Sequence, residues 1–201
     1  MQLYHTPNSP YARRARLAVR EAGLLGRVEE IDLHPREENL ARLLAVAPAG
    51  KVPVLVTDGG AALCESLVIA HHLDDVSGGK LYPRDPAARE RALEVEGLAS
   101  ALMDSLFVRS REKRRPQAEQ SPGVIELEAE RAVRLYDALA ARVAVLSADA
   151  PDMASLTTAA ALGYADGRHP DDGWRDGRAA LASWFAAIMK RPALAETVPA
   201  F

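Results

Sequence analysis

The sequence predicts a small α/β domain followed by an all-helical domain. Strand and helix patterns alternate over residues 1–80, and almost no strand signal occurs after them. The two regions are joined by Leu81-Tyr82-Pro83-Arg84-Asp85-Pro86, a linker that its prolines stiffen. A chain of 201 residues has room for two small domains. We therefore expect one domain over residues 1–80 and a second over residues 86–201.

The first domain is expected to follow the order β-α-β-α-β-β-α. Residues 2–5 form a short β-like run, and a helix follows that begins at Pro10, with Ser9 as its N-cap and Gly23 as its stop. A strand–helix–strand start requires a parallel strand pair, and the turn Asp58-Gly59-Gly60 adds an antiparallel pair. The later strands are expected over residues 28–33, 52–56 and 61–64, and the later helices over residues 38–46 and 66–76.

The second domain is expected to contain four helices. Asp85-Pro86 and Ser121-Pro122 each begin a helix with a cap and a first-turn proline. A third helix begins near Asp152, with Ser155 at the spacing of a capping box, and Pro192 is expected to close the fourth. The apolar residues at helical spacing are Val95, Leu98, Leu102 and Leu106, then Ala132, Leu135, Tyr136, Leu139, Val143 and Leu146, then Leu156, Ala159, Ala160, Gly163 and Tyr164, then Leu181, Trp184, Phe185 and Ile188.

Composition excludes several classes of protein. Apolar residues make up 48% and charged residues 26%, which excludes wholesale disorder, and a net charge of −3 offers no basic excess to a nucleic acid. One cysteine excludes a disulfide framework and a Cys-rich zinc site, and the five histidines show no metal spacing. No apolar run is long enough to span a membrane, and residues 1–14 lack a signal core. We expect a cytoplasmic protein that binds no metal, nucleic acid or membrane.

Three short segments of the first domain carry candidate binding chemistry. Ser9 stands at a helix start, where free N–H groups and a partial positive charge stabilise an anion such as a thiolate. Val52-Pro53 begins a strand, where Val52 can pair its backbone with an extended ligand. Glu65-Ser66 stands at a strand-to-helix junction, where Glu65 can take an ammonium group and the Ser66 N–H a carboxylate. Taken singly, each segment is explained as well by a helix cap, an edge proline or a solvated acid; together they match the three parts of glutathione.

With these segments the chain resembles the glutathione S-transferases. The matching pieces are residues 4–14, 48–55 and 63–69, and the helical second half also fits. Residues 111–121 and 161–164 resemble the bacterial YibF-like branch of that family. The resemblance implies a thioredoxin-like N-terminal domain that binds glutathione and an all-α C-terminal domain that carries the electrophile pocket. It also implies a homodimer, a role in detoxification, and glutathione as co-substrate without a metal.

The resemblance assigns roles to the three segments. It implies that Pro53 is cis and that Val52 pairs with the cysteinyl backbone of glutathione. Glu65 and Ser66 hold the γ-glutamyl end. Ser9 stabilises the thiolate of bound glutathione, which is itself the nucleophile that attacks a small electrophile.

Further residues are assigned by the same resemblance. Lys51 and His34 lie near the glycine end of glutathione, and Asp104 could reach the glutathione of a partner subunit. The electrophile is expected where the helical domain faces the first helix, and its candidate residues are Tyr11, Met103, Phe107, Arg111 and Tyr164.

Several alternatives stay open. Thr6 and Asn8 are also polar near the helix start, so either can replace Ser9 as the hydrogen-bond donor to the sulfur. Met103 and Phe107 also fit a core stripe, and Cys64 is interpreted as a small buried residue in a strand. A glutathione-dependent peroxidase or disulfide reductase is the second functional hypothesis, and a catalytically silent binding protein is the third.

Overall fold

The computed structural model describes residues 1–34 and 38–201 and divides into two compact units. The first unit contains Met1–Arg84 together with Pro192–Phe201, and the second contains Asp85–Arg191. The chain thus leaves the first unit after Arg84 and returns to it for its last ten residues. In the described residues, no helix is long and apolar enough to cross a membrane.

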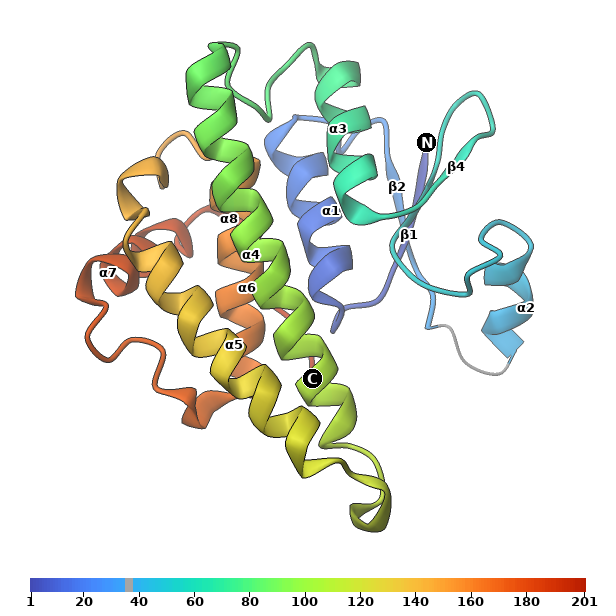
Figure 1. The fold of residues 1–201 in the computed structure, drawn as a ribbon. Coiled ribbons are helices and arrows are strands. Elements are labelled where there is room, and N and C mark those ends of the chain that lie inside the picture. The colour runs from blue at the N-terminus through green and yellow to red at the C-terminus, as the bar shows by residue number, and fades with distance from the viewer. Residues whose placement is uncertain (35–37) are drawn as a thin grey trace. The chain divides into compact units, whose positions relative to one another are not determined.

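The first unit is built on a mixed four-stranded sheet of the order β2-β1-β3-β4 (Figure 1). β1 (Gln2–His5) runs parallel to β2 (Glu29–Asp32) and antiparallel to β3 (Val54–Val56), which pairs with β4 (Ala62–Leu63). The parallel pair and the hairpin both follow the predicted topology. This is the predicted thioredoxin-like arrangement, with strands two to four residues long.

Helices cover both faces of this sheet. α1 (Pro10–Glu21) and α3 (Ser66–Ser77) pack against each other. In addition, α1 contacts β1 and α3 contacts β3. On the opposite face lies α2 (Glu38–Leu44), where Leu43 joins Tyr4 and Val54 in one apolar cluster (Figure 1). Because side chains alternate along a strand, the sheet presents apolar groups to both layers.

The second unit is helical. It contains α4 (Pro86–Glu112), α5 (Pro122–Ala140), α6 (Met153–Arg168) and α7 (Ala179–Ile188), and α4 packs along both α5 and α6. Three 3₁₀ turns lie between these helices, η1 (Gln117–Glu119), η2 (Val143–Val145) and η3 (Pro170–Asp172). The predicted caps Asp85, Ser121 and Asp152 are confirmed, since each side chain accepts a hydrogen bond from a backbone N–H of the first turn.

The capping box at Asp152 differs from the reciprocal form. The Asp152 carboxylate accepts from the Ser155 N–H at 3.0 Å and from the Ser155 hydroxyl at 3.1 Å. The Ser155 oxygen in turn accepts from the N–H of Ser147 at 3.0 Å. Ser155 therefore ties the preceding loop to the helix start, in addition to supporting the cap.

Two predicted helix ends are wrong. Val143 and Leu146 lie beyond α5, which ends at Ala140; the 3₁₀ turn η2 keeps a three-residue spacing and so continues the apolar periodicity. Pro192 does not close the fourth helix, because α7 ends at Ile188 and Pro192 opens the short helix α8 (Pro192–Ala195). A proline suits a first helical position as well as it suits the residues after a helix end, so the sequence alone does not separate the two cases.

Candidate functional site

The register of the sheet brings the predicted glutathione segments to one end of it. His5, which precedes the Ser9 turn, lies opposite Asp32, which precedes His34. Because β1 and β3 are antiparallel, the same end of β1 lies beside the start of β3, and Tyr4 pairs with Val54. β4 is antiparallel to β3 in turn, so its exit toward Glu65 lies beside the start of β3 as well. Ser9, His34, Lys51, Val52, Pro53, Glu65 and Ser66 thus all lie in or beside loops that leave this end.

Ser9 caps the first helix. Its hydroxyl oxygen accepts a hydrogen bond from the Ala12 N–H at 3.2 Å, and its side chain is half-buried. An oxygen that accepts the cap bond still carries its own proton, which it can donate to an anion beside the helix start. Thr6 is buried, whereas Asn8 is half-buried like Ser9. Access to the sulfur of a ligand therefore favours Ser9 or Asn8 over Thr6.

The Val52–Pro53 peptide bond is cis, as the resemblance implied. Pro53 is buried and Val52 is half-buried, and both precede the β3 ladder, whose first pair is Tyr4 with Val54. The Val52 N–H and carbonyl are thus outside the interstrand pairing. Lys51 and His34 are both exposed.

Glu65 adopts an unusual backbone conformation at the start of α3. It is the N-cap residue, with φ 51° and ψ 144°, and its side chain makes no capping hydrogen bond. A non-glycine residue in this region is strained, and such strain is typical of functional sites. The exposed carboxylate is therefore presented to solvent instead of being used by the helix.

Ser66 is the first residue of α3, and Glu65 before it occupies the cap position. Its hydroxyl oxygen accepts two hydrogen bonds from Arg14 of α1, from Nη2 at 2.6 Å and from Nε at 3.2 Å. Both residues are buried. In the sequence, Arg14 carries no signal of this role beyond its place among four arginines on one helix.

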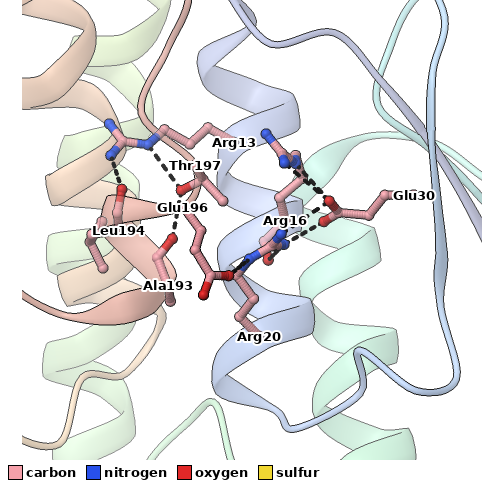
Figure 2. A network of polar contacts seen from close by, with 8 residues as sticks. All are labelled: Arg13, Arg16, Arg20, Glu30, Ala193, Leu194, Glu196 and Thr197. Atoms are coloured by element: carbon pink, nitrogen blue, oxygen red, sulfur yellow. Dashed lines mark hydrogen bonds and ion pairs between the residues drawn. The ribbon is translucent and has the colours of Figure 1, made fainter.

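The other arginines of α1 serve different partners (Figure 2). Arg16 and Arg20 pair with Glu30 on β2, while Arg20 also donates to Glu196 at 3.2 Å. Burial acts to raise the pKa of Glu30, but hydrogen bonds from Arg20 and Arg16 outweigh it and hold that pKa below its usual range. The carboxylate is thus ionised at neutral pH and anchors β2 to α1.

Arg13 holds the end of the chain against α1. It is buried, and it donates to the Leu194 carbonyl at 3.2 Å and to the Thr197 hydroxyl at 3.4 Å (Figure 2). Thr197 in turn donates to the Ala193 carbonyl at 2.8 Å. Burial, with a smaller effect of Arg16, lowers the pKa of Arg13 to about 10, so it stays protonated at neutral pH.

The predicted electrophile residues differ in accessibility. Met103 and Tyr164 are buried, at 0% and 2% exposure. For Met103, this burial favours a place in the hydrophobic core over a place in a substrate pocket. Tyr11 and Phe107 are half-buried, and Arg111 is exposed near the end of α4.

Cys64 is exposed, so its prediction as a buried residue is wrong. β4 ends at Leu63, so Cys64 lies beyond the strand. Asp104 is also exposed. In the part of the chain that the structure describes, no group of three His, Cys, Asp or Glu side chains could hold a metal ion.

Comparison with known proteins identifies the family. Residues 8–76 match the family model of the glutathione S-transferase N-terminal domain. The chain is 31% identical to glutathione S-transferase 3 of Zea mays, with 100% of this chain and 94% of that protein covered. It is 29% identical to the uncharacterized GST-like protein YibF of Escherichia coli (strain K12), with 99% and 98% covered.

A solved structure agrees over the whole chain. A glutathione transferase family member from Pseudomonas fluorescens Pf-5, determined with bound glutathione, superposes with a TM-score of 0.87 at 33% identity and covers 100% of this chain and 99% of that one. The fold therefore defines a protein with a thioredoxin-like domain followed by a helical domain. The chain belongs to the glutathione S-transferase family.

Proposed function

We propose that this protein is a glutathione S-transferase that stabilises the thiolate of bound glutathione for attack on a small electrophile. The observation that carries the proposal is the half-buried Ser9 hydroxyl at the start of α1, whose oxygen accepts the cap bond and whose proton is left to donate. Glutathione bound in a similar structure supports the choice of co-substrate.

The chemistry asked of Ser9 is modest. Lowering a thiol pKa by about two units requires about 2.7 kcal/mol of preferential stabilisation of the thiolate. A hydrogen bond to a charged group contributes about 1.5–3 kcal/mol, and a helix N-terminus adds about 0.3–1 kcal/mol. The two effects together reach the required magnitude without a cationic side chain beside the sulfur.

The rest of the tripeptide is assigned to the same end of the sheet. Glu65 receives the glutamyl ammonium group, and the N–H groups of the first turn of α3, beginning at Ser66, receive its carboxylate. Val52, which precedes Pro53 and the β3 ladder, pairs with the cysteinyl backbone. Lys51 and His34, both exposed, receive the glycine carboxylate.

The electrophile and the assembly complete the proposal. In the helical unit, Phe107 and Arg111 retain exposed surface that a substrate can contact, whereas Met103 and Tyr164 are buried. In the first unit, Tyr11 is half-buried. We further propose that the protein acts as a cytoplasmic homodimer in detoxification.

Replacing Ser9 by Ala tests the assignment. The absorbance of the thiolate, titrated at saturating glutathione, is expected to show a pKa raised by about one to two units, because the donor to the sulfur is lost. Ser121→Ala is the matched control, since Ser121 also caps a helix ahead of a proline and accepts from a backbone N–H at 3.4 Å. Both variants lose the hydrogen bond that caps a helix, but only Ser9→Ala is expected to change the pKa of the bound glutathione thiol. An unchanged titration removes Ser9 from the role and turns attention to Asn8.

A substrate comparison separates the three functions. A chlorinated aromatic tests transfer, while a peroxide or a glutathione mixed disulfide tests reduction. The helix start carries serine where a redox protein of this fold needs a thiol, so we expect turnover of the aromatic. Glutathione binding without any turnover points to a silent binding protein, and no binding contradicts the proposal.

A further inference from the structure

A buried hydrogen-bonded fork joins the two helices that carry the proposed glutathione residues. Nε and Nη2 of Arg14 both donate to the Ser66 oxygen, at 3.2 and 2.6 Å. Arg14 is 3% exposed and Ser66 is 1% exposed. The helix of Arg14 begins beside Ser9, and the helix of Ser66 begins beside Glu65.

The fork acts on the exact point where α3 begins. Ser66 is the first helical residue, and Glu65 before it has φ 51°. A strained residue persists only where its surroundings over-determine it, and two hydrogen bonds on the next side chain supply such a restraint. Glu65 has no capping bond of its own to hold it.

The fork also sets the hydrogen-bonding direction of Ser66. A serine oxygen has two lone pairs and one proton, and Arg14 occupies both lone pairs. Any further hydrogen bond that Ser66 makes is therefore one that it donates, which is the direction that a carboxylate requires.

No other arginine of α1 has this connection among the contacts described above. Arg13 bonds to the C-terminal segment, and Arg16 and Arg20 bond to Glu30. These contacts anchor α1 to other segments of the first unit and do not involve Ser66. The contact with the first turn of α3 is made by Arg14.

We infer that Arg14 is a positioning residue that holds Glu65 and the first turn of α3 in the geometry that recognises the γ-glutamyl end of glutathione. The inference rests on the proposed function. It assigns to Arg14 a part in binding the amino and carboxylate groups of the substrate, exerted through Ser66, and no part in activating the thiol.

Calorimetry with two ligands tests this role in the full-length protein. The ligands are glutathione and butanoyl-cysteinylglycine, which lacks both the amine and the carboxylate of the glutamyl group. Arg14→Met removes the fork and is expected to weaken glutathione binding about tenfold, because about one charge-assisted hydrogen bond is lost from the support of the site. Binding of the truncated ligand is expected to change less than twofold.

Three further variants sharpen the test. Ser66→Ala should weaken glutathione binding as Arg14→Met does, and the double variant should be no weaker than the worse single variant, since both remove one interaction. Arg14→Lys, which keeps the charge but not the fork, serves if Arg14→Met does not fold and should also weaken glutathione selectively. Arg16→Met is the matched control, because it removes an arginine from the same helix and should leave both affinities unchanged.

The outcomes separate the inference from the proposed function. Equal weakening of both ligands, or unchanged glutathione binding in folded Arg14 variants, overturns the role of Arg14 while leaving the transferase proposal intact. The role of Arg14 is also overturned if Arg14→Met raises the thiol pKa measured at saturating glutathione, because the proposed function assigns control of that pKa to Ser9. Absence of glutathione binding by the unsubstituted protein overturns the proposed function and the inference with it.

Discussion

Glu65 illustrates at the scale of one residue how a binding site differs from the fold around it. Of the described residues other than glycine, it alone has a positive φ, of 51°. Glycine adopts such a conformation without a steric penalty, so a different residue here costs folding stability. The position nevertheless carries a carboxylate, which is consistent with its proposed role toward the glutamyl ammonium group.

Two substitutions separate the strain at Glu65 from its charge. Glu65→Ala and Glu65→Gly both remove the carboxylate, but only glycine relieves the strained backbone. We expect the glycine variant to be more stable than the alanine variant by about 1 kcal/mol in urea denaturation. Both variants should bind glutathione more weakly than the unsubstituted protein. An alanine variant as stable as the glycine variant would show that the backbone is not strained.

His169 makes the stability of the helical unit depend on pH. Its Nε2 lies 2.9 Å from the Leu106 carbonyl, and burial lowers its pKa to about 4. An unfolded histidine, with its ordinary pKa of 6.5, binds a proton more readily than the native one. Stability is therefore fully present above about pH 6.5 and is lost as the pH falls toward 4. His5, whose pKa burial also lowers, contributes in the same direction in the other unit.

Urea denaturation between pH 7 and 4.5 measures this dependence. His169→Gln retains a side-chain donor for the Leu106 carbonyl but does not titrate, so its stability should decline less steeply with acidification. His72→Gln, at a half-buried position on α3, is the control for the exchange of histidine for glutamine outside the helical unit. Equal slopes in all three proteins would contradict the assignment to His169.

At the scale of elements, α1 connects the parts of the first unit. Its arginines reach β2 through Glu30, α3 through Ser66 and the C-terminal segment through Leu194 and Thr197. The sequence suggested none of this, because four arginines on a helix are typical of a solvated face. Their partners lie far away in the sequence, and Arg13 and Thr197 are 184 positions apart. Local periodicity carries no information about contacts over such a separation.

Loss of the Arg13 contact should loosen the C-terminal segment. Arg13→Met leaves the Leu194 carbonyl without its donor in a buried place, so we expect a cost of about 2 kcal/mol in unfolding free energy. Hydrogen exchange over residues 192–201 should accelerate at the same time. Glu196→Gln is the control, because it weakens only a pair whose carboxylate is 57% exposed, and it should cost less than about 0.5 kcal/mol. Unchanged exchange in Arg13→Met would contradict the anchoring role.

Element boundaries show what local signals predict well. The predicted β1 agrees with the structure because a turn follows it directly, and α4 and α5 begin at the predicted cap and proline. Predictions fail where one signal has two structural meanings, as at Pro192 and at the 3₁₀ turn that follows α5. The burial of Cys64 was mispredicted for a different reason, since a strand of two residues ends before it. In the candidate site, Ser9 and Glu65 carry local signals, but the Arg14 fork depends on tertiary packing.

For the whole molecule, the return of the chain to its first unit is the main departure from a simple succession of domains. Residues 1–84 and 192–201 form one compact unit. Removal of residues 192–201 should therefore destabilise α1 and the sheet more than the helical unit. Hydrogen exchange followed by mass spectrometry, resolved by peptide, measures this directly. Equal loss of protection in α1 and in α5, or none in α1, would contradict it.

The anchoring of the C-terminal segment also constrains the order of events during synthesis. At a translation rate of about 5–20 residues per second, Thr197 follows Arg13 out of the ribosome by about 10 to 40 s. Throughout that interval Arg13 lacks the Leu194 and Thr197 acceptors that it has in the folded protein, so the first unit, whose synthesis begins first, is completed only when residues 192–201 arrive.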